Sequence, residues 1–229
     1  MPDLSLLGLG LYSIPEASRI SHVSPESIRR WLWGYRYAAK GKLRRAEPLW
    51  KPRLPKIDDA RALTFRDLIE IQFVHRFRQE GLSLQSIRRA IGLATKLLEE
   101  SHPLSSIKFK TDGRSILAQV VEPEEQACVF DLTTGQYLFD FVLEYLYDAL
   151  EYSALDELVR WWPLGKERRV LVDPKRSFGR PIVKEGVPTA ILAGSHKAEG
   201  SVSAVARWFE VAEESVEDAL EYERSLRAA

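Results

Sequence analysis

The sequence predicts an α+β protein that is mainly α-helical and is built of three parts. Helix start signals and apolar residues at three- and four-residue spacing dominate residues 1–100. Alternating apolar residues, followed by one amphipathic helix, characterise residues 101–165, and residues 166–229 combine short strands with helices. A chain of 229 residues with 45% hydrophobic content is long enough for more than one core. We therefore expect three regions with these boundaries.

Two short helices open the chain, and each begins with a capping signal. Residues 13–16 (SIPE) have the pattern of a capping box and predict a helix from about residue 14 to residue 20. Residues 24–26 (SPE) repeat the signal, and Ile28, Trp31 and Leu32 follow at helical spacing. Two short helices separated by a turn of three or four residues form a helix-turn-helix.

The segment after Gly34 loses helical periodicity until Thr64. It carries Pro48, Pro52 and Pro55, with apolar residues between them. We expect an irregular hairpin, or wing, in this segment, longer and richer in proline than a short hairpin.

Two longer helices follow the predicted wing. Thr64 is the N-cap of the first, whose broad apolar face extends to Gly81, a typical residue just beyond a helix end. Ser83 begins the second, which keeps its apolar side down to Leu98. The first hundred residues therefore predict helix, helix, wing, helix, helix.

The pattern changes to one of short strands after residue 100. Residues 107–110, 116–121 and 127–132 predict a small antiparallel sheet, with Asp112-Gly113 and Thr134-Gly135 as turns. Residues 137–152 are apolar at helical spacing and predict one amphipathic helix.

The last region begins with strands and ends with helices. Residues 170–172 predict a strand and residues 181–187 a tight hairpin around Glu185-Gly186. Ser201 and Ser215 are expected to start helices over residues 201–209 and 215–227. The pair Trp161-Trp162 is expected to pack at the joint between the middle and last regions, because aromatic side chains are typical of cores and interfaces.

Charge divides the chain into unlike halves. Residues 1–100 hold 18 Lys and Arg against 11 Asp and Glu, and residues 101–229 hold 15 against 22. The first half is suited to a polyanion and the second is not, and the acidic balance of the last region favours a basic protein partner over DNA.

The sequence predicts a cytoplasmic protein without cofactor or metal. Cys128 is the single cysteine, so no disulfide forms within the chain, and a reducing compartment is expected. No apolar stretch approaches a membrane span, and we expect no membrane partner. The four histidines have no ligand spacing, and no phosphate-binding loop, zinc pattern or nucleophile elbow occurs. We therefore expect no catalytic residue and no enzyme activity.

Residues 11–99 resemble the MerR family in several tracts that keep their order and spacing. These tracts are 12–19 (YSIPEASR), 23–31 (VSPESIRRW), 63–68 (LTFRDL) and 81–89 (GLSLQSIRR). The resemblance implies a winged helix-turn-helix with its recognition helix in the major groove, a wing on the phosphates, and a homodimer on two-fold operator DNA.

Basic residues at the expected interface support double-stranded DNA as the partner. Arg29 and Arg30 lie early on the second helix, where arginine reaches guanine edges or phosphates. The full set of predicted DNA-binding residues is Ser24, Glu26, Ser27, Arg29, Arg30, Arg36, Lys40, Lys42, Arg44 and Arg45.

Residues 170–223 resemble the small C-terminal domain of VapB-like antitoxins. The matching tracts are 172–174, 178–183, 185–189, 199–201, 205–209 and 215–222, and the chain departs from the usual Gly-Thr-Arg at Gly186-Val187-Pro188. The resemblance implies a small domain like a winged helix-turn-helix that neutralises a toxin, commonly a PIN-type ribonuclease, and represses the shared operon. The predicted partner-binding residues are Phe178, Arg180, Trp208 and Phe209.

The sequence favours a dimeric DNA-binding antitoxin and leaves alternatives open. The last region is alternatively a second DNA-binding or dimerisation module without a toxin. A regulator that senses a small ligand is the second reading, with Phe139, Phe141, Tyr145 and Trp161 lining a pocket. A nuclease is a weaker third reading, since no carboxylate constellation suits metal-dependent cleavage.

Overall fold

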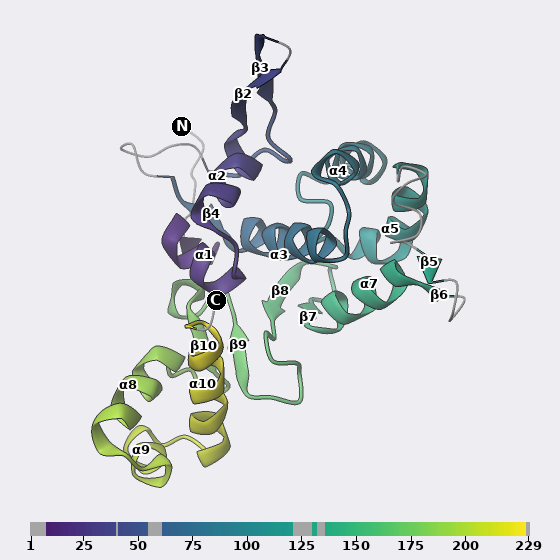
Figure 1. Cartoon of the computed structure of the whole chain (residues 1–229). Coiled ribbons are helices and arrows are strands. Elements are labelled where there is room, and N and C mark those ends of the chain that lie inside the picture. The colour runs from purple at the N-terminus through teal and green to yellow at the C-terminus, as the bar shows by residue number, and fades with distance from the viewer. Residues whose placement is uncertain (1–7, 40, 55–60, 121–129, 132–135, 228–229) are drawn as a thin grey trace, which may run out of the picture.

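The computed structural model describes residues 8–39, 41–54, 61–120, 130–131 and 136–227. These residues form a mainly helical α+β structure with small antiparallel sheets (Figure 1). A two-stranded hairpin projects from one end of the molecule, and the last three helices form the other end. None of the helices in the described ranges is long and apolar enough to cross a membrane.

The first two helices begin at the predicted caps. In α1 (Ile14–Ser21), Ser13 Oγ accepts the N–H of Glu16, whose carboxylate accepts the N–H of Ser13 at 2.8 Å. In α2 (Pro25–Trp33), Ser24 is the N-cap and Pro25 is the first residue. Strand β1 (Leu11–Tyr12) pairs antiparallel with β4 (Leu63–Thr64) and so brings the start of α1 beside the start of the third helix.

The predicted wing is a regular hairpin and not an irregular one. Strand β2 (Tyr35–Ala39) pairs antiparallel with β3 (Lys42–Ala46), from Tyr35 opposite Ala46 to Ala39 opposite Lys42. Gly41 takes φ +72° in the turn. Pro48 and Pro52 lie beyond the hairpin, so they leave its ladder of hydrogen bonds intact, and Pro55 lies outside the described residues.

Helix α3 (Phe65–Gln79) is the centre of the main core. Its capping box joins Thr64 and Asp67, as the sequence predicts. Phe73 and Phe77 are almost completely buried, and buried residues occur around the whole helix. Helix α4 (Leu84–Leu98) starts at the predicted N-cap Ser83 and buries one side, including Ile87 and Ile91.

The strands predicted over residues 107–110 and 116–121 are wrong, because α5 (Ile107–Val120) occupies this segment. Its buried residues Phe109, Gly113, Ile116 and Leu117 lie on one helical face. The alternation at the start of the segment coincides with this helical pattern. Gly113 makes room for the ring of Phe109, whose Cε1 lies 2.7 Å from where a Cβ on Gly113 would stand.

The amphipathic helix predicted over residues 137–152 ends earlier than expected. Helix α7 spans Leu138–Asp148, and β7 (Leu150–Tyr152) follows as a strand because β8 (Leu158–Trp161) pairs with it. Short strands β5 (Phe130–Asp131) and β6 (Gln136–Tyr137) pair before α7. Of the predicted strand over 127–132, residues 127–129 and 132 lie outside the described residues, and so does Cys128.

A four-stranded antiparallel sheet joins the middle and last regions. Its order is β10-β9-β8-β7, with β9 (Val170–Val172) and β10 (Pro181–Val183) at the predicted strand and hairpin. The sheet therefore spans the boundary expected after residue 165. Trp162 packs with Leu171 and Ile182 in a small buried cluster at this joint.

Three helices close the described chain. They are α8 (Thr189–Glu199), α9 (Val202–Phe209) and α10 (Glu213–Ser225). Ser201 caps α9 as predicted, whereas α10 begins two residues before Ser215, whose hydroxyl donates to Glu185 instead. Helix α8 escapes sequence reasoning because its N-cap is Pro188, which offers no side-chain acceptor.

The first and last regions are joined directly. The buried hydroxyl of Tyr12 donates to the carbonyl of Gly179 at 2.6 Å. Gly179 follows Ser177 and Phe178 in the short 3₁₀ turn η2 (Ser177–Gly179), in which all three residues have positive φ. Arg19 of α1 also lies 3.9 Å from the carboxylate of Glu223 in α10.

Two buried carboxylates of α3 hold the segment that follows α4. Asp67 accepts from Trp50 Nε1 and pairs with His102 Nε2, each at 2.9 Å. Burial alone would raise the pKa of Asp67, but hydrogen bonds from His102, Thr64 and Trp50 hold it below its ordinary value. Glu70 accepts the backbone N–H of Ser105 at 2.8 Å.

Burial raises the pKa of Glu70 to about 7, from an ordinary value of 4.5. The unfolded chain thus loses this proton at lower pH than the folded protein, so stability falls as pH rises through this window. The loss is at most about 3–4 kcal/mol, since the two pKa values differ by about 2.5 and one pKa unit corresponds to about 1.4 kcal/mol. Glu70→Gln is expected to remove this loss. Urea unfolding of the wild type and the variant at pH 5 and pH 7.5 measures the loss. The same pH dependence of stability in the two proteins would contradict the raised pKa of Glu70.

Candidate nucleic-acid interface

Helix α2 divides into a buried face and an exposed face. Ile28 and Leu32 are fully buried, whereas Glu26, Arg29 and Arg30 are exposed. Ser24 and Ser27, both predicted to contact DNA, are joined by two hydrogen bonds. Ser24 Oγ accepts the backbone N–H of Ser27 as the helix cap and donates to Ser27 Oγ at 2.9 Å. Their hydroxyls therefore serve the start of the helix.

The two adjacent arginines of α2 have different surroundings. Arg30 pairs with Glu26 at 2.8 Å, and its guanidinium lies 5.1 Å from the centre of the Tyr35 ring. Arg29 makes no ion pair with any residue in the described part of the chain. Arg29 thus remains available to a ligand, whereas Arg30 connects α2 to the hairpin.

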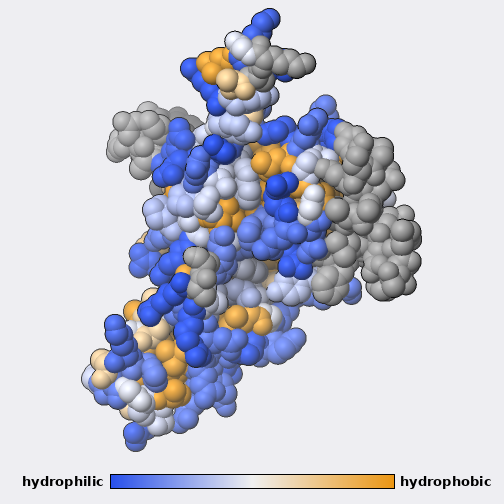
Figure 2. Space-filling model, in the orientation of Figure 1, coloured by the Kyte–Doolittle hydropathy of each residue, from blue (hydrophilic) through white to orange (hydrophobic). Residues whose placement is uncertain are grey.

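The hairpin carries most of the other predicted DNA-binding residues. Arg36, Lys42, Arg44 and Arg45 are all exposed on it, and Lys40 lies outside the described residues. Arg45 has an exposed ion pair with Glu47 at 3.5 Å, a kind of contact that contributes little to stability. Figure 2 shows apolar surface among the hydrophilic surface of this projecting hairpin.

Contacts at the base of the hairpin hold it against the helices. The N–H of Leu49 donates to the carbonyl of Trp31 at 2.7 Å, and Arg88 of α4 donates to the carbonyl of Glu47 at 3.1 Å. A hollow of about 300 Å³ between α2 and the hairpin is lined by Trp33, Gly34, Tyr35, Arg36 and Arg45. Sequence reasoning missed Trp33, Tyr35 and Arg88, although the alternation of Tyr35, Arg36 and Tyr37 is a strand signal.

The residues predicted to bind a protein partner lie in the last region. Phe178 and Trp208 are strongly exposed, at 73% and 72%, and Arg180 is exposed as well. Phe209 is half-buried and packs against the core of the C-terminal helices. Phe178 lies in η2 and Trp208 in α9, so different elements display the two aromatic rings.

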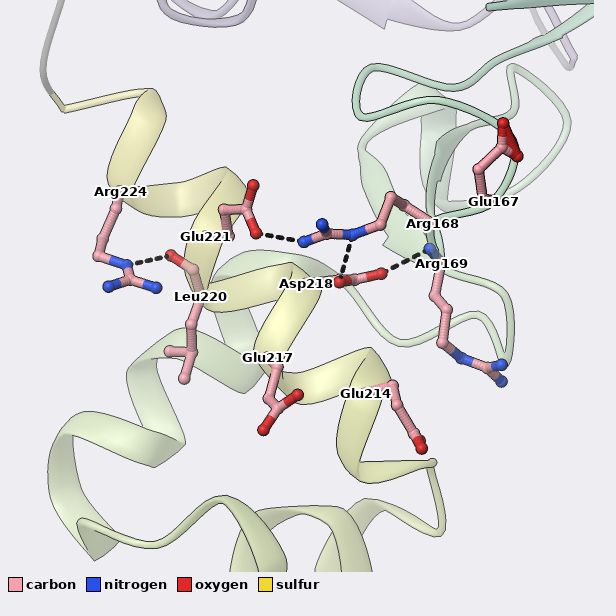
Figure 3. A pocket seen from close by; sticks show the side chains of 9 residues that line it. All are labelled: Glu167, Arg168, Arg169, Glu214, Glu217, Asp218, Leu220, Glu221 and Arg224. Atoms are coloured by element: carbon pink, nitrogen blue, oxygen red, sulfur yellow. Dashed lines mark hydrogen bonds and ion pairs between the residues drawn. The ribbon is translucent and has the colours of Figure 1, made fainter.

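A hollow of about 760 Å³ lies along α10, lined mainly by charged residues (Figure 3). Arg168 donates to Asp218 at 2.7 Å and also contacts Glu221, while the N–H of Arg169 donates to Asp218 at 2.7 Å. Glu214 and Glu217 line the same hollow, and neither has an ion pair with a described residue. The surface of α10 is therefore acidic, with part of its charge already neutralised.

The residues considered for a small-ligand pocket have separate surroundings. Tyr145 is 58% exposed, with Arg76 5.7 Å from its ring centre, and Trp161 packs against the main core from β8. The side chains of Phe139 and Phe141 lie outside the described residues.

Comparison with known proteins gives a fold match. No protein-family model matches the chain, and no curated protein matches it. The chain is similar to the crystal structure of Rv2018 from Mycobacterium tuberculosis, with 24% sequence identity and a TM-score of 0.72. The match covers 93% of this chain and 98% of Rv2018. The two proteins therefore share a fold over nearly their whole length.

The hairpin base gives a stability prediction. Gly34 has φ +71°, and a Cβ there would stand 2.2 Å from the carbonyl oxygen of Ala46. Gly41 has φ +72° in open space. We expect Gly41→Ala to cost about 1 kcal/mol from backbone strain alone, and Gly34→Ala to cost about 3 kcal/mol because the strands must also move. Urea unfolding of both variants measures these losses of unfolding free energy. Equal losses would contradict the close approach of Gly34 to the carbonyl oxygen of Ala46.

Proposed function

We propose that residues 11–99 form a MerR-like winged helix-turn-helix that binds double-stranded operator DNA as a homodimer. Helix α1 supports α2, which lies in the major groove, and hairpin β2–β3 is the wing. The observation that carries this proposal is the exposed face of α2 beside a projecting hairpin with four exposed cations in its described strands.

Charge supports a nucleic acid over a protein as the partner of this surface. Among the described residues, Glu26 and Glu47 pair with its arginines, and both pairs are exposed. Exposed pairs of this kind exchange readily for phosphate, because each contributes little in water. Binding of these cations to phosphates releases counterions and is therefore weakened by salt.

The test of this proposal compares Arg29→Ala with Arg207→Ala, a change to an exposed arginine of α9. Sites are first selected from a random DNA pool by the wild-type protein. Arg29→Ala is expected to lose about 1–3 kcal/mol of discrimination, because a base-reading arginine is removed. Arg30→Ala is expected to weaken specific binding as well. Both variants should keep the wild-type oligomeric state in size-exclusion chromatography, and unchanged affinity of both would refute α2 as the recognition helix.

We further propose that the protein is an antitoxin whose last region, residues 166–229, neutralises a PIN-type ribonuclease, and that the DNA-binding region represses their operon. The resemblance of residues 170–223 to VapB-like antitoxins supports this. Exposed aromatic rings are typical anchors of protein interfaces, and Phe178 and Trp208 are exposed here. The acidic surface of α10 complements a basic, RNA-binding partner.

Co-purification from the native host tests the antitoxin proposal. A stoichiometric small protein should cleave RNA alone and lose this activity when the purified chain is added back. Phe178→Ala and Trp208→Ala should each weaken the complex, because a large apolar contact is lost. Leu155→Ala is the matched control, since Leu155 is 83% exposed outside this region. Recovery of the homodimer with DNA alone would favour a free-standing regulator.

A further inference from the structure

Two adjoining hollows lie beside the start of α3. The smaller, of about 240 Å³, lies between the first region and strand β8. The larger, of about 530 Å³, lies between the segment after the hairpin and His102. Arg53 and Arg66 line both hollows, which therefore form one groove. Its size is in the range of about 300–1,000 Å³ that is typical of sites for small molecules.

Positive charge predominates among the described residues that line this groove. The lysines and arginines are Lys51, Arg53, Arg66 and Lys175, and the one carboxylate is Glu157. Lys51, Arg53 and Lys175 are exposed, and none of them has an ion pair with a described residue. Cations gathered in a concave site attract anions more strongly than the same cations spread over a flat surface.

The charge of Arg66 is only weakly compensated. Its guanidinium lies 4.0 Å from the carboxylate of Glu100, which also lies 3.4 Å from Lys108 Nζ. One carboxylate is thus shared by two cations. Arg66 is half-buried near the start of α3, so the helix fixes its position, and a guanidinium forms paired hydrogen bonds with phosphate. The ring nitrogens of His102 already bond to Asp67 and Ser101.

The smaller hollow adds an apolar lining to these charges. Its apolar residues come from four segments of the chain and are Leu9, Phe65, Leu158, Val159 and Pro174. Glu157 lies beside them and offers acceptors for N–H or O–H groups. Apolar surface with a few polar groups is typical of sites that hold a heterocyclic ring. The groove therefore has one end suited to phosphate and one suited to a base.

We propose that this groove binds a nucleoside phosphate. The phosphates lie at Lys51, Arg53 and Arg66, and the base lies among the apolar residues beside Glu157. A recess with an apolar lining fits a small molecule that enters it, whereas a DNA duplex carries its phosphates on the outside of a rod. The ligand contacts both the first region and β8, so its binding stabilises the joint between them. This inference goes beyond the proposed function and does not depend on it.

The first experiment measures binding of small molecules to the full chain. The four ribonucleoside triphosphates, adenosine and inorganic tripolyphosphate are titrated by calorimetry without divalent cations. At least one nucleotide should bind more tightly than tripolyphosphate, which has the phosphates without the nucleoside, and adenosine should bind least. The same nucleotide should raise the melting temperature. Equal affinity for tripolyphosphate and every nucleotide, or no binding of any nucleotide, overturns the proposal.

The second experiment locates the phosphates. Lys51→Ala/Arg53→Ala should weaken nucleotide binding about tenfold or more, because charge-assisted hydrogen bonds to phosphate are lost. Both residues are exposed, so the variant should keep the melting temperature of the free protein. Lys197→Ala/Arg207→Ala is the matched control, since it removes two exposed cations of α8 and α9. An equal loss of affinity in the two variants overturns the site.

The third experiment locates the base. Val159→Phe fills part of the apolar lining and should weaken nucleotide binding while tripolyphosphate binding is unchanged. Unchanged nucleotide affinity overturns the position of the base.

Duplex DNA selected by the wild-type protein separates the groove from the proposed DNA interface. Lys51→Ala/Arg53→Ala should keep its affinity for this duplex at constant salt concentration. If it loses duplex and nucleotide binding to the same extent, the groove is a DNA contact and the proposal is overturned. If the protein selects no DNA but binds a nucleotide in the groove, the proposed function fails and this inference stands.

Discussion

The carboxylate of Asp67 is the interaction on which the arrangement of the first half depends. It accepts a hydrogen bond from Trp50 in the segment after the hairpin, and it forms the capping box of α3 with Thr64. It also bonds to His102 in the segment between α4 and α5. Asp67 is fully buried, and its partners Trp50, Thr64 and His102 are almost completely buried. A buried donor without a partner costs about 1–3 kcal/mol, and loss of this one group would leave several. The segments that contain Trp50 and His102 and the start of α3 therefore share one carboxylate.

The helix starts that could be predicted are those that depend on neighbouring residues alone. Ser13, Ser24, Thr64 and Ser83 each cap the next helix through a contact three residues away, which a sequence displays directly. Helix α5 was missed because its first residues also fit a strand, and only its packing against α4 decides between the two. Strand β7 likewise requires β8 as its partner.

The candidate interface divides in the same way. The exposed cations of α2 and the hairpin were predicted, because charge and helical spacing identify them without a fold. The contacts that orient these cations were not predicted, because they depend on the fold. The guanidinium of Arg30 lies over the Tyr35 ring across a turn, and Arg88 of α4 donates to the carbonyl of Glu47, 41 residues earlier in the chain. The register of the hairpin strands, which places Arg36 opposite Arg45, was not predicted either, because the prolines of this segment predicted an irregular hairpin.

The bond from Tyr12 to Gly179 spans 167 residues of chain and has a consequence for synthesis on the ribosome. At about 5–20 residues per second, the acceptor emerges roughly ten to thirty seconds after the donor. During that interval α1 and α2 exist with the Tyr12 hydroxyl lacking its acceptor, so the amino-terminal half of a nascent chain is less stable than in the finished protein. Helix α1, and with it α2, gains this contact only when the carboxyl-terminal region has been made, so full stability of the amino-terminal end depends on synthesis of the other end.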